Sequence, residues 1–120
     1  MALVVAGAAG SSVRYLVDIA ITERTRSALP WGTMAINVTG SFVLGVVTGL
    51  ALYHGFPKEV RVVLGVGFCG AYTTFSTFTF ETVRLLEEGE PAEALVNVAG
   101  TFLAAALAAA AGLALAAIGS

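Results

Sequence analysis

Four long apolar segments, separated by short polar stretches, constrain this chain more than any other feature of its sequence. Of its 120 residues, 58% are hydrophobic and 12% are charged, whereas a soluble domain carries roughly 25% charged residues. Since a bilayer crossing takes about 20 apolar residues, a chain of this length allows four crossings joined by short connections. We therefore expect an all-α membrane protein, with residues 1–120 forming a single four-helix transmembrane domain.

Proline residues and aromatic residues predict where these helices begin and end. Pro57 and Pro91 suit first helical turns, while Trp31 and Tyr53 lie about 33 Å apart along a helix, so that an aromatic ring marks each membrane interface. His54 is then an interfacial residue. The expected helices span approximately residues 2–21, 31–53, 58–88 and 91–118.

The third segment predicts a broken helix, because glycines and then hydroxyl residues fill its centre. We expect the break near residues 70–73, close to the bilayer midplane, where freed backbone groups need partners within the protein. Unwound carbonyls suit a small hard cation, and the helix N-terminus that follows suits an anion. A glycine kink satisfied by neighbouring hydroxyls is the alternative, and the residues alone favour the kink.

Several functional classes are not expected. Six basic residues and a net charge of −2 give no surface for nucleic acid. The sequence also has no pattern of catalytic triad, metal ligands or phosphate-binding loop, so an enzyme is not expected. A single cysteine, Cys69, excludes an intramolecular disulfide and reads as a small core residue.

Polar and aromatic residues near the expected break are the candidates for a binding site. Phe75 and Phe78 share one helical face, with Thr74 and Thr77 on an adjacent one. Such a stripe normally packs or faces lipid, but ring edges together with hydroxyl and amide donors can hold a small anion. Asn37 offers such an amide, or else an ordinary interhelical hydrogen bond.

Charged residues within the apolar segments need partners. Arg14 and Asp18, at i and i+4, form either a structural ion pair or the lining of an anion-attracting vestibule, and both interpretations stay open. Glu81 has Arg84 at i+3 as an available partner. Close helix packing is expected at small residues, namely Gly45, Gly49, Gly100, Ala104 and Ala108.

The basic residues near the segment ends give no preferred orientation. One side carries Arg24, Arg26 and Arg84, and the other carries Lys58, Arg61 and the terminal amine. Such a tie fits a protein that inserts both ways round, and it also arises by chance.

Taken together, these motifs resemble the Fluc family of small bacterial fluoride channels, a camphor-resistance type of membrane protein. The similarity lies in residues 7–15, 31–42 and 67–78, and the run from Thr73 to Phe78 is the most specific. Three features depart from the family pattern or weaken it. Ser11 and Ser12 occupy a region that is often richer in glycine, Tyr72 places a bulky ring inside the break, and the fourth helix offers only Asn97 and Thr101 as polar candidates.

The resemblance implies a fluoride-selective channel in the inner cell membrane that exports fluoride passively and protects the cell from fluoride toxicity. It further implies an antiparallel, dual-topology homodimer with two pores. The backbone carbonyls of Gly70 and Thr73 from both subunits would hold a structural sodium ion at the dimer centre, without an organic cofactor. The implied partners are fluoride, sodium, the lipid bilayer and a second copy of the chain, with no nucleic acid.

The same resemblance assigns roles to individual side chains. Phe75 and Phe78 would contact fluoride through their ring edges, and Asn37 would donate a hydrogen bond to the ion. Polar groups along the pore would come from Thr74, Ser76 and Thr77, with Arg14 near an aqueous vestibule.

Two other functions remain as alternatives. A small multidrug-resistance-type, proton-coupled exporter shares the length and the four helices, but that class relies on a glutamate in its first helix, where this chain has Asp18 beside Arg14. A non-transporting membrane assembly subunit would use the polar third segment only to hold helices together.

Overall fold

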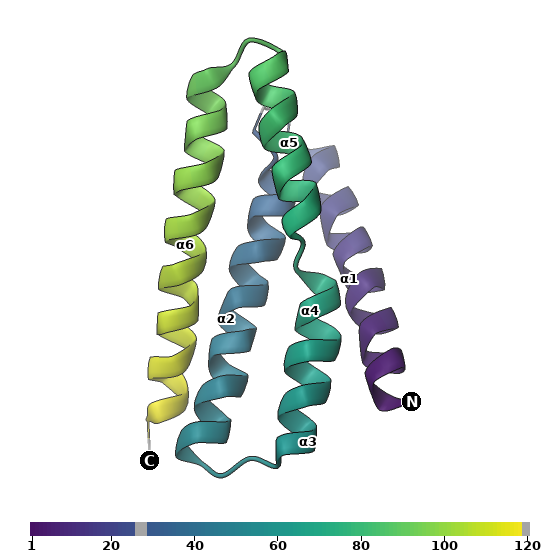
Figure 1. Ribbon diagram of the computed structural model, residues 1–120, viewed down its shortest axis with the longest axis vertical. Helices are drawn as coiled ribbons and strands as arrows, with labels where there is room; N and C mark the ends of the chain where they lie inside the picture. Colours follow the sequence, from purple (N-terminus) through teal and green to yellow (C-terminus); the bar gives the residue numbers. More distant parts are fainter. Residues whose placement is uncertain (26–28, 119–120) are drawn as a thin grey trace.

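The computed structural model describes residues 1–25 and 29–118, which form helices joined by short non-helical connections, with no strand among them. The helices follow one another up and down the long axis of the molecule (Figure 1). In chain order they are α1 (Ala2–Arg24), α2 (Trp31–Tyr53), α3 (Lys58–Arg61), the π-helical η1 (Val62–Cys69), α4 (Gly70–Tyr72), α5 (Phe75–Glu87) and α6 (Pro91–Ala117).

Within the described residues, four helical stretches are long and apolar enough to cross a membrane: α1, α2, the composite stretch Lys58–Glu87, and α6. This confirms the expected number of crossings. The helix boundaries differ little from the predicted ones, since α1 continues to Arg24 and α6 ends at Ala117.

The break in the third crossing lies at Thr73 and Thr74, the last residue of the predicted interval and the one after it. Both residues are extended, with φ −76° and ψ 158° at Thr73 and φ −147° and ψ 121° at Thr74. The preceding stretch Gly70–Tyr72 stays helical as α4. The expected unwinding of Gly70 is therefore wrong. The helix resumes at α5 because the Thr74 hydroxyl accepts the Thr77 N–H, which caps the new N-terminus.

Glycines allow α2 and α6 to pack closely along their length. A Cβ atom on Gly45 would collide with the Ala109 carbonyl oxygen, and one on Gly112 would collide with the Phe42 carbonyl oxygen. A Cβ on Gly49 would lie 2.6 Å from the Ala116 Cβ. The expected close packing is confirmed at Gly45 and Gly49, whereas Gly100 has nothing within 4 Å.

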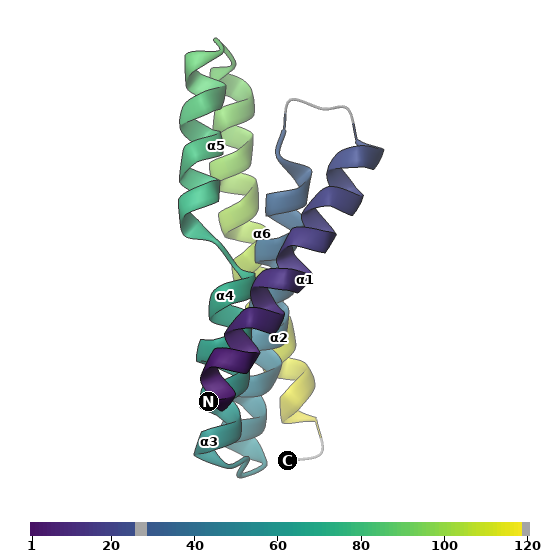
Figure 2. The same ribbon diagram turned by 90° about the vertical axis from the view of Figure 1, so that its right-hand side faces the viewer.

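The first helix packs against the lower half of the third crossing, which Figure 2 shows as α1 running across α4. Gly10 permits this contact, because a Cβ there would collide with the Phe68 carbonyl oxygen.

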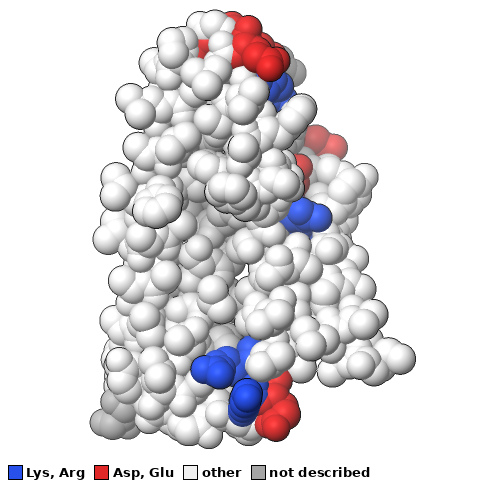
Figure 3. All heavy atoms as spheres, viewed as in Figure 1, with Lys and Arg blue, Asp and Glu red and all other residues white. Residues whose placement is uncertain are grey.

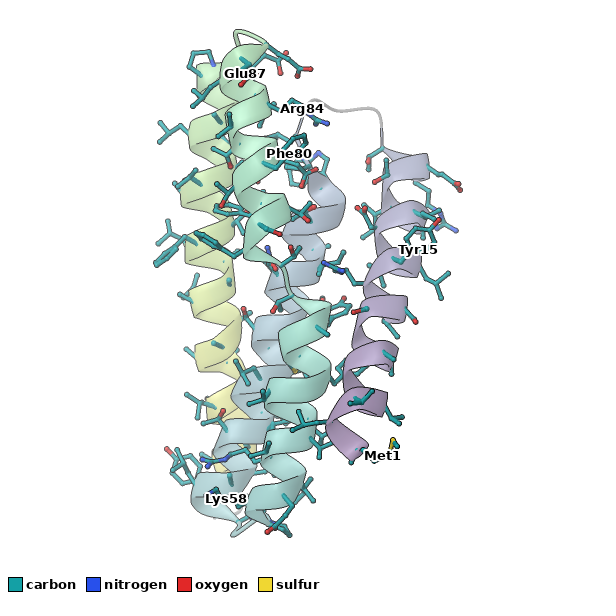
Figure 4. The ribbon with its side chains drawn as sticks, turned by 45° about the vertical axis from the view of Figure 1, so that its right-hand side comes forward. Met1, Tyr15, Lys58, Phe80, Arg84 and Glu87 are labelled. Carbon is teal, nitrogen blue, oxygen red and sulfur yellow. The ribbon has the colours of Figure 1, made fainter. Side chains whose placement is uncertain are left out.

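Charged side chains gather mainly toward the two ends of the face shown in Figure 3, and its middle band is uncharged except for a small basic patch on the right. Figure 4 places Lys58 and Met1 toward one end and Arg84 and Glu87 toward the other. These are the two sides of the orientation tally, in which Arg26 lies outside the described residues.

Candidate functional site

The break is held in place by one side chain of α2. The Asn37 Nδ2 donates to the Thr74 carbonyl at 3.1 Å, and the Thr74 N–H donates to Asn37 Oδ1 at 2.9 Å. In a continuous helix the Thr74 N–H would donate to the carbonyl of Gly70, four residues earlier. The amide of Asn37 therefore replaces helical partners at the point where the helix is interrupted.

Gly70 and Thr73 lie beside this interruption. The carbonyl of Gly70 loses its usual helical donor, and Gly70 itself is exposed in the single chain. The Thr73 hydroxyl points toward the preceding helical turn, because it donates a hydrogen bond of 2.8 Å to the Cys69 carbonyl. Carbonyl oxygens are the ligand type that hard cations accept, so the chemistry of these two residues fits a sodium ion.

A groove of about 500 Å³ opens between α2, the α4–α5 break and α6, and it corresponds to the hollow at mid-height in Figure 3. Phe75 and Phe78 stand on its wall with their ring centroids 6.1 Å apart at an interplanar angle of 40°. Phe75 is 80% exposed in the single chain. The predicted site residues that line the groove are Asn37, Gly70, Thr73, Thr74, Phe75 and Phe78.

A second, smaller cavity of about 190 Å³ lies toward α1. Its lining includes Arg14, Asp18, Thr33, Thr74 and Thr77. Because Thr74 lines both cavities, it stands between them.

Arg14 lines the second cavity without a bonded partner in the part of the chain that the structure describes. The alternative of an Arg14–Asp18 ion pair is not realised, because Asp18 instead accepts a hydrogen bond from the Thr22 hydroxyl at 3.4 Å. The half-buried guanidinium lies beside hydroxyl groups, and the Asp18 carboxylate lines the same cavity. The vestibule alternative depends on this placement of Arg14 at a cavity wall.

Arg84, the partner available to Glu81 at i+3, does not form an ion pair with it among the described residues. Glu81 Oε1 accepts a hydrogen bond of 2.5 Å from the Thr33 hydroxyl, and Arg84 instead pairs with Glu88 at 4.0 Å. The carboxylate turns inward because α2 offers it a buried hydroxyl, while Arg84 lies toward the polar end of α5.

Thr33 is a residue that the sequence analysis missed. A signal was present, since Thr33 and Asn37 are spaced i,i+4 on α2, and Thr77 and Glu81 repeat that spacing on α5. Because polar side chains at membrane depth need partners, two such stripes on neighbouring helices favour an arrangement in which they face each other.

The polar residues of α6 divide between two roles. Asn97 is 1% exposed and donates to the Thr82 hydroxyl at 2.9 Å, which ties α6 to α5. Thr101 donates to Asn97 Oδ1 at 3.3 Å and also lines the groove. Ser76, in contrast, is exposed and lines neither cavity, so the structure does not bring it together with the other predicted residues.

His54, which the sequence predicts at a membrane interface, lies at the end of α2. It follows the last residue of α2, and its Nε2 lies 2.7 Å from the Ala116 carbonyl near the end of α6. This contact joins two helix ends and lies outside both cavities.

Comparison with known proteins gives one family. The sequence model of the family described as "CrcB-like protein, Camphor Resistance (CrcB)" matches residues 1–113. The match therefore spans both cavities and the break.

Curated relatives carry a consistent name. "Fluoride-specific ion channel FluC 1" of Leifsonia xyli subsp. xyli is 48% identical over 113 residues, which are 94% of this chain and 82% of that protein. The protein of the same name from Frankia casuarinae is 48% identical over 120 residues, covering 95% of this chain and 93% of its own length. "Fluoride-specific ion channel FluC" of Nitrobacter winogradskyi is 45% identical over 102 residues, covering 84% and 81%.

Proposed function

This chain belongs to the CrcB-like, camphor-resistance family, and we propose that it is a fluoride-selective channel through which fluoride leaves the cell passively. One observation carries the proposal from the geometry. The two cavities meet at Thr74, and the groups around that meeting point are neutral donors and two phenyl rings.

Fluoride enters from the second cavity, where the Arg14 guanidinium, which pairs with no carboxylate among the described residues, attracts the anion. It then passes Thr77 and Thr74 and reaches the groove beside Asn37 and the two rings. Hydrogen-bond donors and positive ring edges replace its water shell, and selectivity requires a path that a larger halide cannot enter without clashes. Conduction down the electrochemical gradient consumes neither ATP nor an organic cofactor.

The working unit is an antiparallel homodimer with two pores. Asn37 and Thr73 line the groove and are partly exposed in the single chain at membrane depth, where contact of their polar groups with lipid is unfavourable. A second copy laid over this face covers those groups and the exposed ring of Phe75. The balanced basic residues at the two ends support insertion in both orientations.

The backbone carbonyls of Gly70 and Thr73 from both subunits would hold the structural sodium ion of this dimer. Such a cation would neutralise the carbonyl dipoles beside the break. The two residues line one groove in a single chain, so two copies bring four such carbonyls to a shared face.

The test is efflux from liposomes that contain the purified protein, with fluoride and chloride electrodes. We expect rapid fluoride release, negligible chloride release and no need for a pH gradient. Comparable efflux rates for fluoride and chloride overturn the proposed fluoride selectivity. Efflux that depends on a proton gradient favours a proton-coupled exporter, and the absence of any flux favours an assembly subunit. Light scattering in detergent and tag accessibility from both membrane sides test the dimer and its dual topology.

A further inference from the structure

Three consecutive residues at the break contact one stretch of α2. Thr74 bonds to Asn37, as described above, and the Tyr72 hydroxyl lies 2.8 Å from the Thr39 hydroxyl. Between them, the Thr73 methyl group touches Gly40 so closely that a Cβ there would collide with it. Three contacts with α2 therefore fix the position of the break, from the end of α4 to the start of α5. Figure 2 shows the extended linker between α4 and α5.

The direction of the Tyr72–Thr39 bond follows from counting protons. The Thr39 hydroxyl also lies 2.7 Å from the Ala35 carbonyl, which can only accept. A threonine hydroxyl carries one hydrogen. Both contacts are satisfied when Thr39 donates to Ala35 and Tyr72 donates to Thr39.

The Tyr72 ring has little freedom to move. It is 7% exposed and stacks on Phe68 with ring centroids 5.9 Å apart and an interplanar angle of 15°. A buried phenol without a hydrogen-bond partner is unfavourable, so the bond to Thr39 fixes the ring along its length. Because Tyr72 is the last residue of α4, the ring fixes the backbone from which the Thr73 carbonyl projects.

We propose that Tyr72, through its hydroxyl bond to Thr39, is a positioning residue for the conduction path: it holds the Thr73 carbonyl and the first turn of α5 in register with Asn37. This inference rests on the proposed fluoride channel. It goes beyond it by giving a function to a bulky ring that departs from the family pattern.

The experiment compares Tyr72→Phe and Thr39→Val, which each remove one hydroxyl of the pair, with the double variant. Fluoride efflux is measured per folded dimer, together with chloride efflux and the sodium concentration that gives half-maximal flux. One matched control is Thr39→Ser, which keeps the hydroxyl that accepts the Tyr72 hydrogen bond. The other is Tyr53→Phe, which removes a phenolic hydroxyl at the far end of α2.

We expect each single variant to lower fluoride efflux about fivefold, as loss of one ordinary hydrogen bond does, and the double variant to be no slower than either single one. We also expect a higher sodium requirement or a chloride leak in these variants, which lost stability alone does not produce. Both controls should behave as wild type.

The inference is overturned if both single variants show the same fluoride efflux, selectivity and sodium dependence as the wild type. That result does not contradict the proposed channel function. A wild-type chain without fluoride flux overturns the proposed function, and this inference with it. If Tyr72→Phe does not fold, the Thr39→Val and Thr39→Ser pair decides by the same criteria.

Discussion

The side chain of Asn37 and the backbone of Thr74 exchange two hydrogen bonds, one in each direction, at 3.1 Å and 2.9 Å. An amide side chain donates through its nitrogen and accepts through its oxygen without carrying a charge. The pair therefore stabilises the broken helix in an apolar environment and leaves the site neutral, which an anion path requires.

Replacing Asn37 with aspartate tests this pair. The change keeps the acceptor for the Thr74 N–H but removes the donor and brings a negative charge to the path at membrane depth. We expect fluoride efflux to fall by more than about tenfold, since a charge-bearing group there opposes an anion by well over 1 kcal/mol. Stopped-flow or electrode efflux from liposomes measures it, and wild-type efflux contradicts the role of Asn37.

Removing the ring at Phe75 or Phe78 tests the aromatic wall. We expect Phe75→Ile and Phe78→Ile each to suppress fluoride efflux while the protein stays folded, because an aliphatic side chain has no positive edge. Phe80→Ile makes the same exchange on α5 outside the groove and should conduct normally. Unchanged efflux in both pore variants refutes the aromatic role.

The Thr33–Glu81 bond should contribute to stability. Thr33→Val leaves the Glu81 carboxylate without its donor in a partly buried position, so we expect a loss of about 2 kcal/mol in the free energy of unfolding. Thr33→Ser keeps the hydroxyl and should lose much less. Unfolding of the detergent-solubilised protein by sodium dodecyl sulfate measures both, and equal losses contradict the assigned bond.

Gly112 and Gly100 of α6 should respond differently to a larger side chain. Gly112→Val forces a side chain against the backbone of α2, which we expect to destabilise the protein by about 3 kcal/mol. Gly100→Ala meets open space and should be neutral or slightly stabilising, because alanine favours helix. The same unfolding assay ranks them, and similar effects at both positions contradict the packing of α2 on α6.

The sequence by itself determined the four crossings, the interruption in the third and the shared face of Phe75 and Phe78. These features depend on apolar length, local helix propensity and helical period, which act over a few residues. These features therefore follow from each segment's own sequence, whatever its position relative to the other helices.

Only the tertiary structure decided which polar groups meet. The helix is interrupted at Thr73 and Thr74, and Glu81 accepts a hydrogen bond from Thr33. Arg14 forms no ion pair with Asp18 in the described part of the chain. Ser76 lies outside both cavities. Each outcome depends on which turns of two distant helices lie opposite each other. That register is set by close approach at small residues such as Gly40, and the spacing within one helix does not contain it.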